Sequence, residues 1–193
     1  MIVYLHGFRS SSKSAKAMQL RDAVAALAPA ARPTLVVPDL PHRPLEAIAQ
    51  VAALVERANE TDVAFVGSSL GGYYATHLAE RFDARAIVVN PTVRPYDDLR
   101  PYAGTQINLY SGETFTVADA HFDELRALQV TRIARPDRYL LLVQTGDAVL
   151  DYREAVAFYG GAWQSVQGGG DHAFQGFAAH IPSILRFATS KLH

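Results

Sequence analysis

Short runs of β-branched and other apolar residues alternate with segments of helical period along this chain, and this alternation limits the possible folds more than any other feature. Such a pattern is typical of parallel strands joined by crossover helices. Most of the expected strands are nearly continuous apolar runs, which indicates that helices cover both faces of the sheet. They comprise residues 2–5, 34–37, 63–66, 86–89, 139–143 and 163–166. The sequence therefore predicts the α/β class, with one doubly wound and mainly parallel sheet.

The covering helices are expected where apolar residues recur at three- and four-residue spacing. These segments comprise residues 14–27, 45–59, 71–81, 152–158 and 174–188. A chain of 193 residues is long enough to bury one sizeable core. We therefore expect a single domain over residues 1–193.

One connection departs from this alternation. Residues 91–137 separate two expected strands by far more than a usual crossover, and long connections of this kind are usually functional or disordered. Their aromatic content and the helical stretch of residues 117–128 predict an ordered cap over the edge of the sheet. The alternative is an excursion with a small core of its own.

The composition excludes several classes of function. Eighteen basic residues against 19 acidic ones, without a like-charge run, leave no basic patch of the kind that nucleic acid binding requires. The absence of cysteine excludes disulfides, thiolate nucleophiles and cysteine-ligated zinc. There is no signal-peptide pattern, and no apolar run approaches the roughly 20 residues of a membrane span. We expect a cytoplasmic protein that neither crosses a membrane nor binds nucleic acid.

The segment Gly67-Ser68-Ser69-Leu70-Gly71 points most directly to chemistry. It follows one expected strand and precedes a helix, so Ser69 lies at the apex of a sharp turn. A serine there adopts a strained backbone, at a cost of about 1–3 kcal/mol, and its hydroxyl is lifted clear of the sheet. Glycines are needed at positions 67 and 71 because a side chain would collide where strand and helix approach closely. Ser69 is the expected nucleophile; the alternative is a glycine-rich turn with incidental serines.

A serine hydroxyl needs a base to attack at neutral pH. Among the seven histidines, His172 follows the last expected strand in a glycine-rich loop that can carry an imidazole to Ser69. It is also last in the chain order that this arrangement requires. His77 lies on the helix after Ser69, about 12 Å away and out of hydrogen-bond reach. We therefore expect His172 to be the base.

The base needs an acid that fixes its tautomer. Asp147 lies at the carboxyl end of the strand at residues 139–143, where catalytic groups collect in open α/β sheets. Asp151, near the start of the next helix, is the second candidate, although a carboxylate there has a local role at the helix dipole.

Backbone amides and a pocket residue complete the expected site. The oxyanion requires two fixed donors, and we expect them from Leu70, after the nucleophile, and Phe8, in the loop after the first strand. Gly7 allows the backbone to turn the Phe8 amide toward the substrate; its alternative role is simply to end a strand. Tyr73, on the helix after Ser69, is expected to shape the substrate pocket.

Several motifs, read in order along the chain, are similar to those of a known family. They are Tyr4-Leu5-His6-Gly7-Phe8, Gly67-Ser68-Ser69-Leu70-Gly71-Gly72-Tyr73-Tyr74, Asn90-Pro91, Thr145-Gly146-Asp147 with Leu150-Asp151-Tyr152, and Gly169-Gly170-Asp171-His172-Ala173-Phe174. The chain resembles the YqiA-like group of small bacterial α/β-hydrolase esterases over almost its whole length. The resemblance implies an α/β-hydrolase fold, a triad of Ser69, Asp147 and His172, and activity on acyl esters, with acyl-CoA thioesters as a plausible class. Ala148 departs from the pattern, which has an acidic residue there.

These expectations combine into one mechanism. Ser69 attacks an ester or thioester carbonyl, His172 acts as base and then as acid, and Asp147 orients His172, while water resolves the acyl-enzyme. The partner is a small acyl ester or thioester, and no metal or organic cofactor is required. Two alternatives stay open: a non-catalytic binding module that kept the fold, and an amide hydrolase or peptidase.

Overall fold

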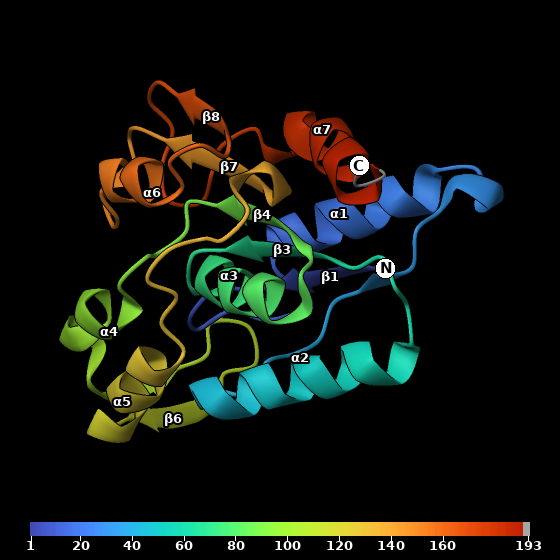
Figure 1. Ribbon diagram of the computed structural model, residues 1–193. Helices are drawn as coiled ribbons and strands as arrows, with labels where there is room; N and C mark the ends of the chain where they lie inside the picture. Colours follow the sequence, from blue (N-terminus) through green and yellow to red (C-terminus); the bar gives the residue numbers. More distant parts are fainter. Residues whose placement is uncertain (191–193) are drawn as a thin grey trace.

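The computed structural model describes residues 1–190 and is built around a six-stranded sheet (Figure 1). The strand order is β2-β1-β3-β4-β7-β8, and every neighbouring pair is parallel. The bounds are β1 Ile2–Leu5, β2 Leu35–Val36, β3 Ala64–Ser68, β4 Arg85–Val89, β7 Tyr139–Gln144 and β8 Trp163–Gln167. The predicted class and all six predicted strands are confirmed.

Helices cover both faces of this sheet because its strands are apolar on both sides. In β1, Ile2 and Tyr4 pack against α1 (Ala15–Ala26) and α7 (Phe177–Thr189). The alternate residues Val3 and Leu5 face the opposite layer. That layer comprises α2 (Pro44–Ala58), α3 (Leu70–Phe82) and α6 (Tyr152–Phe158). The two-residue period of a strand thus divides the core into two halves (Figure 1).

The last helix begins later than the sequence predicted. We expected it from residue 174, but Phe174 and Gly176 both adopt left-handed backbone, with φ of 62° and 74°, and α7 begins at Phe177. A right-handed helix cannot run through two such residues. The segment before α7 is therefore a longer loop, and it carries His172.

The connection at residues 91–137 is ordered. It contains α4 (Pro95–Asp98), an antiparallel hairpin of β5 (Gly104–Ile107) and β6 (Thr114–Val117), and α5 (Asp119–Ala127). The expected helix is present, whereas the hairpin was not predicted. Buried residues of this insertion, Phe122 and Leu125 among them, belong to the same apolar cluster as Val3 and Leu5 of the sheet. The insertion thus extends the main core. Short 3₁₀ turns η1 (Pro29–Ala31), η2 (Arg100–Tyr102) and η3 (Pro136–Arg138) complete the elements.

The tip of the hairpin rests on the loop that follows β1. The amide of Leu109 donates to the Arg9 carbonyl at 3.0 Å, and Asn108 Nδ2 donates to the Ser10 carbonyl at 2.9 Å. At the other end of the insertion, Arg43 beside α2 forms an ion pair with Glu124 of α5. These contacts fix the insertion at both ends over the carboxyl edge of the sheet.

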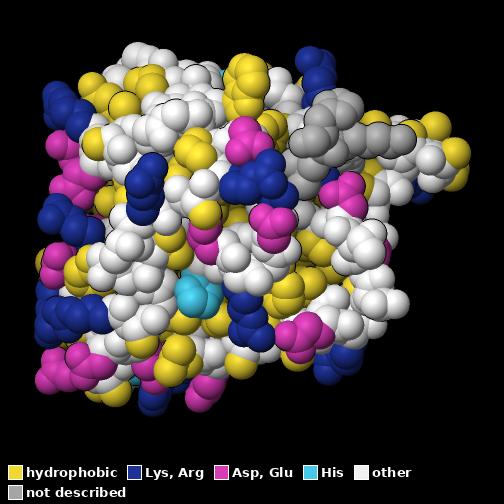
Figure 2. All heavy atoms as spheres, in the orientation of Figure 1, with side chains coloured by type: hydrophobic (Ala, Val, Ile, Leu, Met, Phe, Trp, Pro, Cys, Tyr) yellow, Lys and Arg dark blue, Asp and Glu magenta, His cyan; other side chains and the backbone are white. Residues whose placement is uncertain are grey.

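The outer surface has a mixed charge. On the face shown in Figure 2, basic and acidic side chains lie interspersed over the helices. Among residues 1–190, no helix has the length and hydrophobicity needed to cross a membrane.

Candidate active site

Ser69 lies on a strained turn between β3 and α3. Its φ of 56° and ψ of −122° are unusual for a residue with a side chain. The turn is this tight because backbone packs on backbone. A Cβ at Gly71 would come within 2.0 Å of the Leu5 carbonyl oxygen, and one at Gly67 within 2.0 Å of the Gly71 carbonyl oxygen. The predicted strain and the predicted need for glycine at both positions are confirmed.

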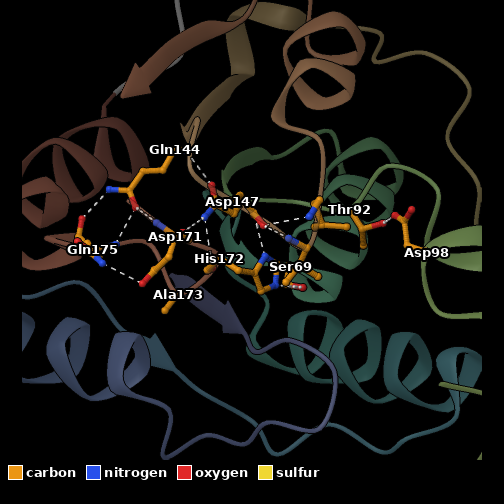
Figure 3. A network of polar contacts seen from close by, with 12 residues as sticks. Ser69, Thr92, Asp98, Gln144, Asp147, Asp171, His172, Ala173 and Gln175 are labelled. Carbon is orange, nitrogen blue, oxygen red and sulfur yellow. Dashed lines mark hydrogen bonds and ion pairs between the residues drawn. The ribbon is translucent and has the colours of Figure 1, made fainter. Parts of the chain in front are cut away.

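The structure brings Ser69, His172 and Asp147 together (Figure 3). His172 Nε2 lies 3.1 Å from Ser69 Oγ, and His172 Nδ1 lies 2.8 Å from Asp147 Oδ2. The Asp147 side chain is 2% exposed and that of His172 is 30% exposed, so the acid is buried while the base reaches the surface. With Asp147 ionised, Nδ1 carries the proton and Nε2 is free to accept one from the serine.

The environment of Asp147 keeps it ionised. Burial is the largest influence and raises its pKa. The hydrogen bond from His172, the amides of Leu150 and Val149, and the charge of His172 together outweigh burial and lower the pKa below its usual value. The two amides donate to Asp147 Oδ1 at 3.0 and 2.8 Å and leave Oδ2 for the imidazole. Asp147 is therefore a fixed carboxylate at neutral pH.

Asp151, the second candidate for the acid, lies elsewhere. It is the N-cap of α6, where its Oδ1 accepts from the Arg153 amide at 3.0 Å. Its contacts satisfy the end of the helix. The structure does not bring it to His172.

Two polar residues hold the loop of His172, and the sequence reasoning missed both as site residues. Asn90 Nδ2 donates to the carbonyls of Asp171 and His172 at 2.9 and 3.3 Å. Gln144 Oε1 accepts from the amides of Asp171 and Gln175 at 3.2 and 2.8 Å (Figure 3). Asn90 and Gln144 are both buried, each at the end of an apolar strand. A polar residue at the carboxyl end of a buried strand was the available signal.

Leu70 directly follows Ser69 in the chain, and the loop that carries Phe8 packs against Ser69. Leu70 is the first residue of α3, where an N–H has no intrahelical acceptor. Phe8 lies in the loop after β1, and a Cβ added at the preceding Gly7 would be only 3.2 Å from the Ser69 Cβ. Within the described residues, the Phe8 amide donates to no protein acceptor.

The buried imidazole of His6 fixes the Phe8 loop. Its Nδ1 lies 3.0 Å from the Gly7 carbonyl, and its Nε2 accepts from the Leu40 amide at 3.0 Å. Burial lowers the pKa of His6 and outweighs the opposing effects of the Gly7 carbonyl and Asp39. The neutral ring therefore connects this loop to the segment after β2.

A cavity of about 220 Å³ lies beside Ser69. Its walls include Phe8, His172 and Tyr110, which comes from the tip of the hairpin. Tyr73 is not one of its lining residues. The Tyr73 side chain is buried under α5, and its hydroxyl donates to the Leu125 carbonyl at 2.6 Å. The structure thus places Tyr73 between α3 and the insertion, away from the cavity in which we expected it.

No group of three or more His, Asp or Glu side chains among residues 1–190 is arranged to hold a metal ion. His77, set aside as a base, points away from Ser69, and its Nδ1 lies 3.0 Å from the Leu128 carbonyl. It therefore contributes to holding the insertion.

The parallel sheet, the strained serine turn and the covering helices define a protein with the α/β-hydrolase fold. Residues 1–189 match the family described as "Uncharacterised protein family (UPF0227)", and the chain belongs to this family. The chain is 25% identical to UPF0227 protein PC1_2487 of Pectobacterium carotovorum. The alignment covers 98% of this chain and 99% of that protein. This chain is 26% identical to UPF0227 protein YcfP of Salmonella arizonae, with the same coverage of both chains. The predicted relationship to the YqiA-like group is confirmed.

Solved structures share the fold at low sequence identity. A putative hydrolase from Agrobacterium vitis superposes with a TM-score of 0.77 at 18% identity, over 98% of this chain and 87% of that one. Est1E from Butyrivibrio proteoclasticus gives a TM-score of 0.67 at 16% identity, over 97% and 84% of the two chains. At such identities the similarity is one of fold.

Proposed function

We propose that this protein is a serine hydrolase that cleaves small acyl esters or thioesters through an acyl-enzyme on Ser69. The observation that carries the proposal is the continuous path of hydrogen bonds from Ser69 Oγ through His172 to the buried Asp147, at 3.1 and 2.8 Å. Each residue has the contact that its role requires: a nucleophile next to a base, and a base next to an acid that orients it.

The geometry supports a two-step reaction. His172 Nε2 takes the proton of Ser69 Oγ as the serine oxygen attacks the carbonyl carbon. The same nitrogen then returns the proton to the leaving oxygen or sulfur, and the acyl group stays on Ser69. Water, deprotonated by His172, then attacks the acyl carbon of this acyl-enzyme; the bond to Ser69 Oγ breaks, His172 returns the proton to Oγ, and the acid leaves. Asp147 stabilises the imidazolium that forms in each step and keeps its Nδ1 proton in place.

The Phe8 and Leu70 amides would stabilise the tetrahedral oxyanion of both steps. Backbone donors that are fixed before the reaction need no reorganisation when the charge develops. In other enzymes, the loss of one such donor lowers kcat by about 10²–10³. The insertion at residues 91–137 acts in this proposal as a cap, since its Tyr110 forms part of the cavity wall.

Fold neighbours favour esters among the possible substrates. They include an esterase domain from Rhodothermus marinus and a monoacylglycerol lipase from Paleococcus ferrophilus. A structure of Est1E carries ferulic acid. An oxygen ester also has a better leaving group than an amide, so we rank a peptidase below an esterase. A non-catalytic binding module would have no use for a strained serine in contact with a base.

Covalent labelling tests the proposal. A fluorophosphonate probe should label Ser69, and Ser69→Ala should lose both the label and the hydrolysis of short 4-nitrophenyl esters while its circular dichroism is unchanged. Ser68→Ala is the matched control, because Ser68 is the adjacent buried serine on the wall of the same cavity, and its side chain forms no hydrogen bond with His172 among the described residues. Label on the Ser69→Ala protein, or full hydrolysis by it, would exclude the mechanism.

A further inference from the structure

We propose that the cavity beside Ser69 binds an anionic group of the ester substrate at the N-terminus of α1, between Lys16 and Ser14. This inference rests on the proposed hydrolase function and specifies its substrate class. The substrate is then a short ester that carries a carboxylate or a similar anion close to the reacting carbonyl.

The first feature is the start of a helix that opens on the catalytic cavity. Ser14, Ala15 and Lys16 form the N-cap and first residues of α1, and all three line the same cavity as Ser69 and His172. The first amides of a helix have no intrahelical acceptor, and together with the helix dipole they favour an anion. Ser14 does not cap them, since its side chain makes no capping hydrogen bond.

The second, independent feature is the Ser14 hydroxyl itself. Ser14 is only 8% exposed, and its Oγ has no hydrogen-bond partner among the described residues. The Tyr4 hydroxyl, also on the cavity wall, faces Ser14 without reaching hydrogen-bond geometry. A buried polar atom without a partner is costly, and such groups are rare in folded proteins. Ser14 lines the cavity, so rotation of its side chain toward a bound ligand would give the hydroxyl the missing partner.

The third feature is the charge on Lys16. Its Nζ donates to the carbonyl of Ala173, the residue after His172, at 2.8 Å, which leaves further N–H donors for a ligand. No carboxylate among the described residues lies within 4.0 Å of it. The ammonium is half-buried, and burial lowers its pKa against the opposing charges of Asp171 and Asp147. A half-buried cation without an ion pair is suited to an anionic ligand.

Two carboxylates, Asp147 and Asp171, face Lys16, and the buried Oδ1 of Asp171 has no hydrogen-bond partner among the described residues, so an anion would be repelled from that side of the ammonium. Asp147 is bound by His172, and Asp171 accepts from Gln175 Nε2 at 3.0 Å. The substrate anion would therefore lie on the α1 side of the cavity, next to Ser14, where the helix terminus and the ammonium act together.

The size and lining of the cavity limit the rest of the substrate. Its volume of about 220 Å³ is below the roughly 300–1,000 Å³ of typical ligand pockets. No leucine, isoleucine, valine or methionine is among its lining residues. The apolar part of the lining consists of alanine methyl groups and aromatic rings, so a long acyl chain would find little aliphatic surface there, whereas a short chain would fit.

Matched ester pairs test the inference and locate the anion. For the acyl side, mono-4-nitrophenyl glutarate is compared with 4-nitrophenyl butyrate. For the leaving-group side, 4-acetoxybenzoate is compared with its neutral methyl ester. All rates are taken above those of Ser69→Ala, which removes spontaneous hydrolysis. We expect the wild type to prefer the anionic member of at least one pair by about tenfold in kcat/KM, the effect of one favourable charge contact.

Variants of Lys16 then show whether this lysine causes the preference for anionic esters. Lys16→Met should bring the anionic-to-neutral ratio close to one, and Lys16→Arg should keep it above one. Lys13→Met is the control, since Lys13 is exposed in the same loop and does not line the cavity. Ser69-dependent hydrolysis without an anion preference, or a ratio that Lys16→Met leaves unchanged, would overturn this inference and leave the hydrolase proposal intact. No hydrolysis of any ester above the Ser69→Ala rate would overturn both.

Discussion

Asp147 and His172 join a buried acid to a partly exposed base: the carboxylate oxygen lies 2.8 Å from Nδ1, and the Asp147 side chain is 2% exposed while that of His172 is 30% exposed. The other Asp147 oxygen is held by the Val149 and Leu150 amides, so the carboxylate cannot rotate away. Asp151 belongs to the same loop, yet it caps α6. Asp147 therefore has the contacts expected of a catalytic acid, whereas Asp151 has those of a structural N-cap.

Replacing the two aspartates should give opposite results. Asp147→Asn should lower kcat by about 10⁴, because an amide stabilises the wrong tautomer of the base and no imidazolium. Asp151→Asn should keep nearly full kcat, because asparagine is an equally good N-cap. Ester hydrolysis by both purified variants, with thermal unfolding as the check on folding, decides between them. A large loss in Asp151→Asn alone would reassign the acid.

Gln144 should act on catalysis through the loop that it holds. Gln144→Ala removes the acceptor of the Asp171 and Gln175 amides, so His172 should move relative to Ser69. A misplacement of about 1 Å can cost on the order of 10² in rate. We expect kcat to fall while KM changes little. Gln164→Ala is the control: it loses two hydrogen bonds to the carbonyls of Val156 and Tyr159, on the outer strand β8, and neither bond involves the His172 loop. Equal kcat losses in the two variants would indicate a general loss of stability.

Most of the fold could be predicted because the strands of a doubly wound sheet are apolar on both faces. Strands β1, β3, β4 and β7 are largely runs of this kind, whereas the edge strand β8 is mixed and partly exposed. The hairpin of β5 and β6 could not be predicted in this way, because its strands alternate between half-buried and exposed residues and contain no apolar run. It is stabilised by docking on the loop of Arg9, a contact distant in the sequence.

The same distinction separates the site residues that could be predicted from those that could not. Ser69, Asp147 and His172 occupy positions that local sequence and chain order define. Asn90 and Gln144 act through hydrogen bonds to a loop distant in the sequence, which only the folded chain reveals. Tyr73 shows the converse: it is close to Ser69 in sequence, but the turn of α3 directs its side chain toward Leu125.

His6 should make stability depend on pH. Because burial lowers its pKa in the folded protein, the unfolded chain binds this proton more readily. The stabilising contribution of neutral His6 is complete at a pH above about 6.5, the pKa of histidine in the unfolded chain, and it is lost as the pH falls below that value. His6→Asn should be less stable than the wild type at pH 7.5, and the difference in free energy of unfolding should narrow by pH 5.5. Leu5→Val, a buried change at the neighbouring last residue of β1 that does not titrate, should show a constant difference. Urea unfolding at several pH values tests this prediction. A difference in free energy of unfolding between the wild type and His6→Asn that stays constant with pH would contradict it.

Ser14→Ala should leave the stability of the protein unchanged or higher, while it reduces the preference for anionic esters. An N-cap serine that bonds to its helix usually contributes about 1 kcal/mol, so its replacement by alanine normally destabilises a protein. Ser14 makes no such bond, and its buried hydroxyl lacks a partner, so the alanine variant should be equally stable or more stable. If the hydroxyl binds a substrate anion, the same variant should lose part of the preference for anionic esters. Thermal unfolding and the glutarate-to-butyrate ratio are measured on one preparation. A destabilised variant with an unchanged ratio would show that Ser14 serves the helix and not the ligand.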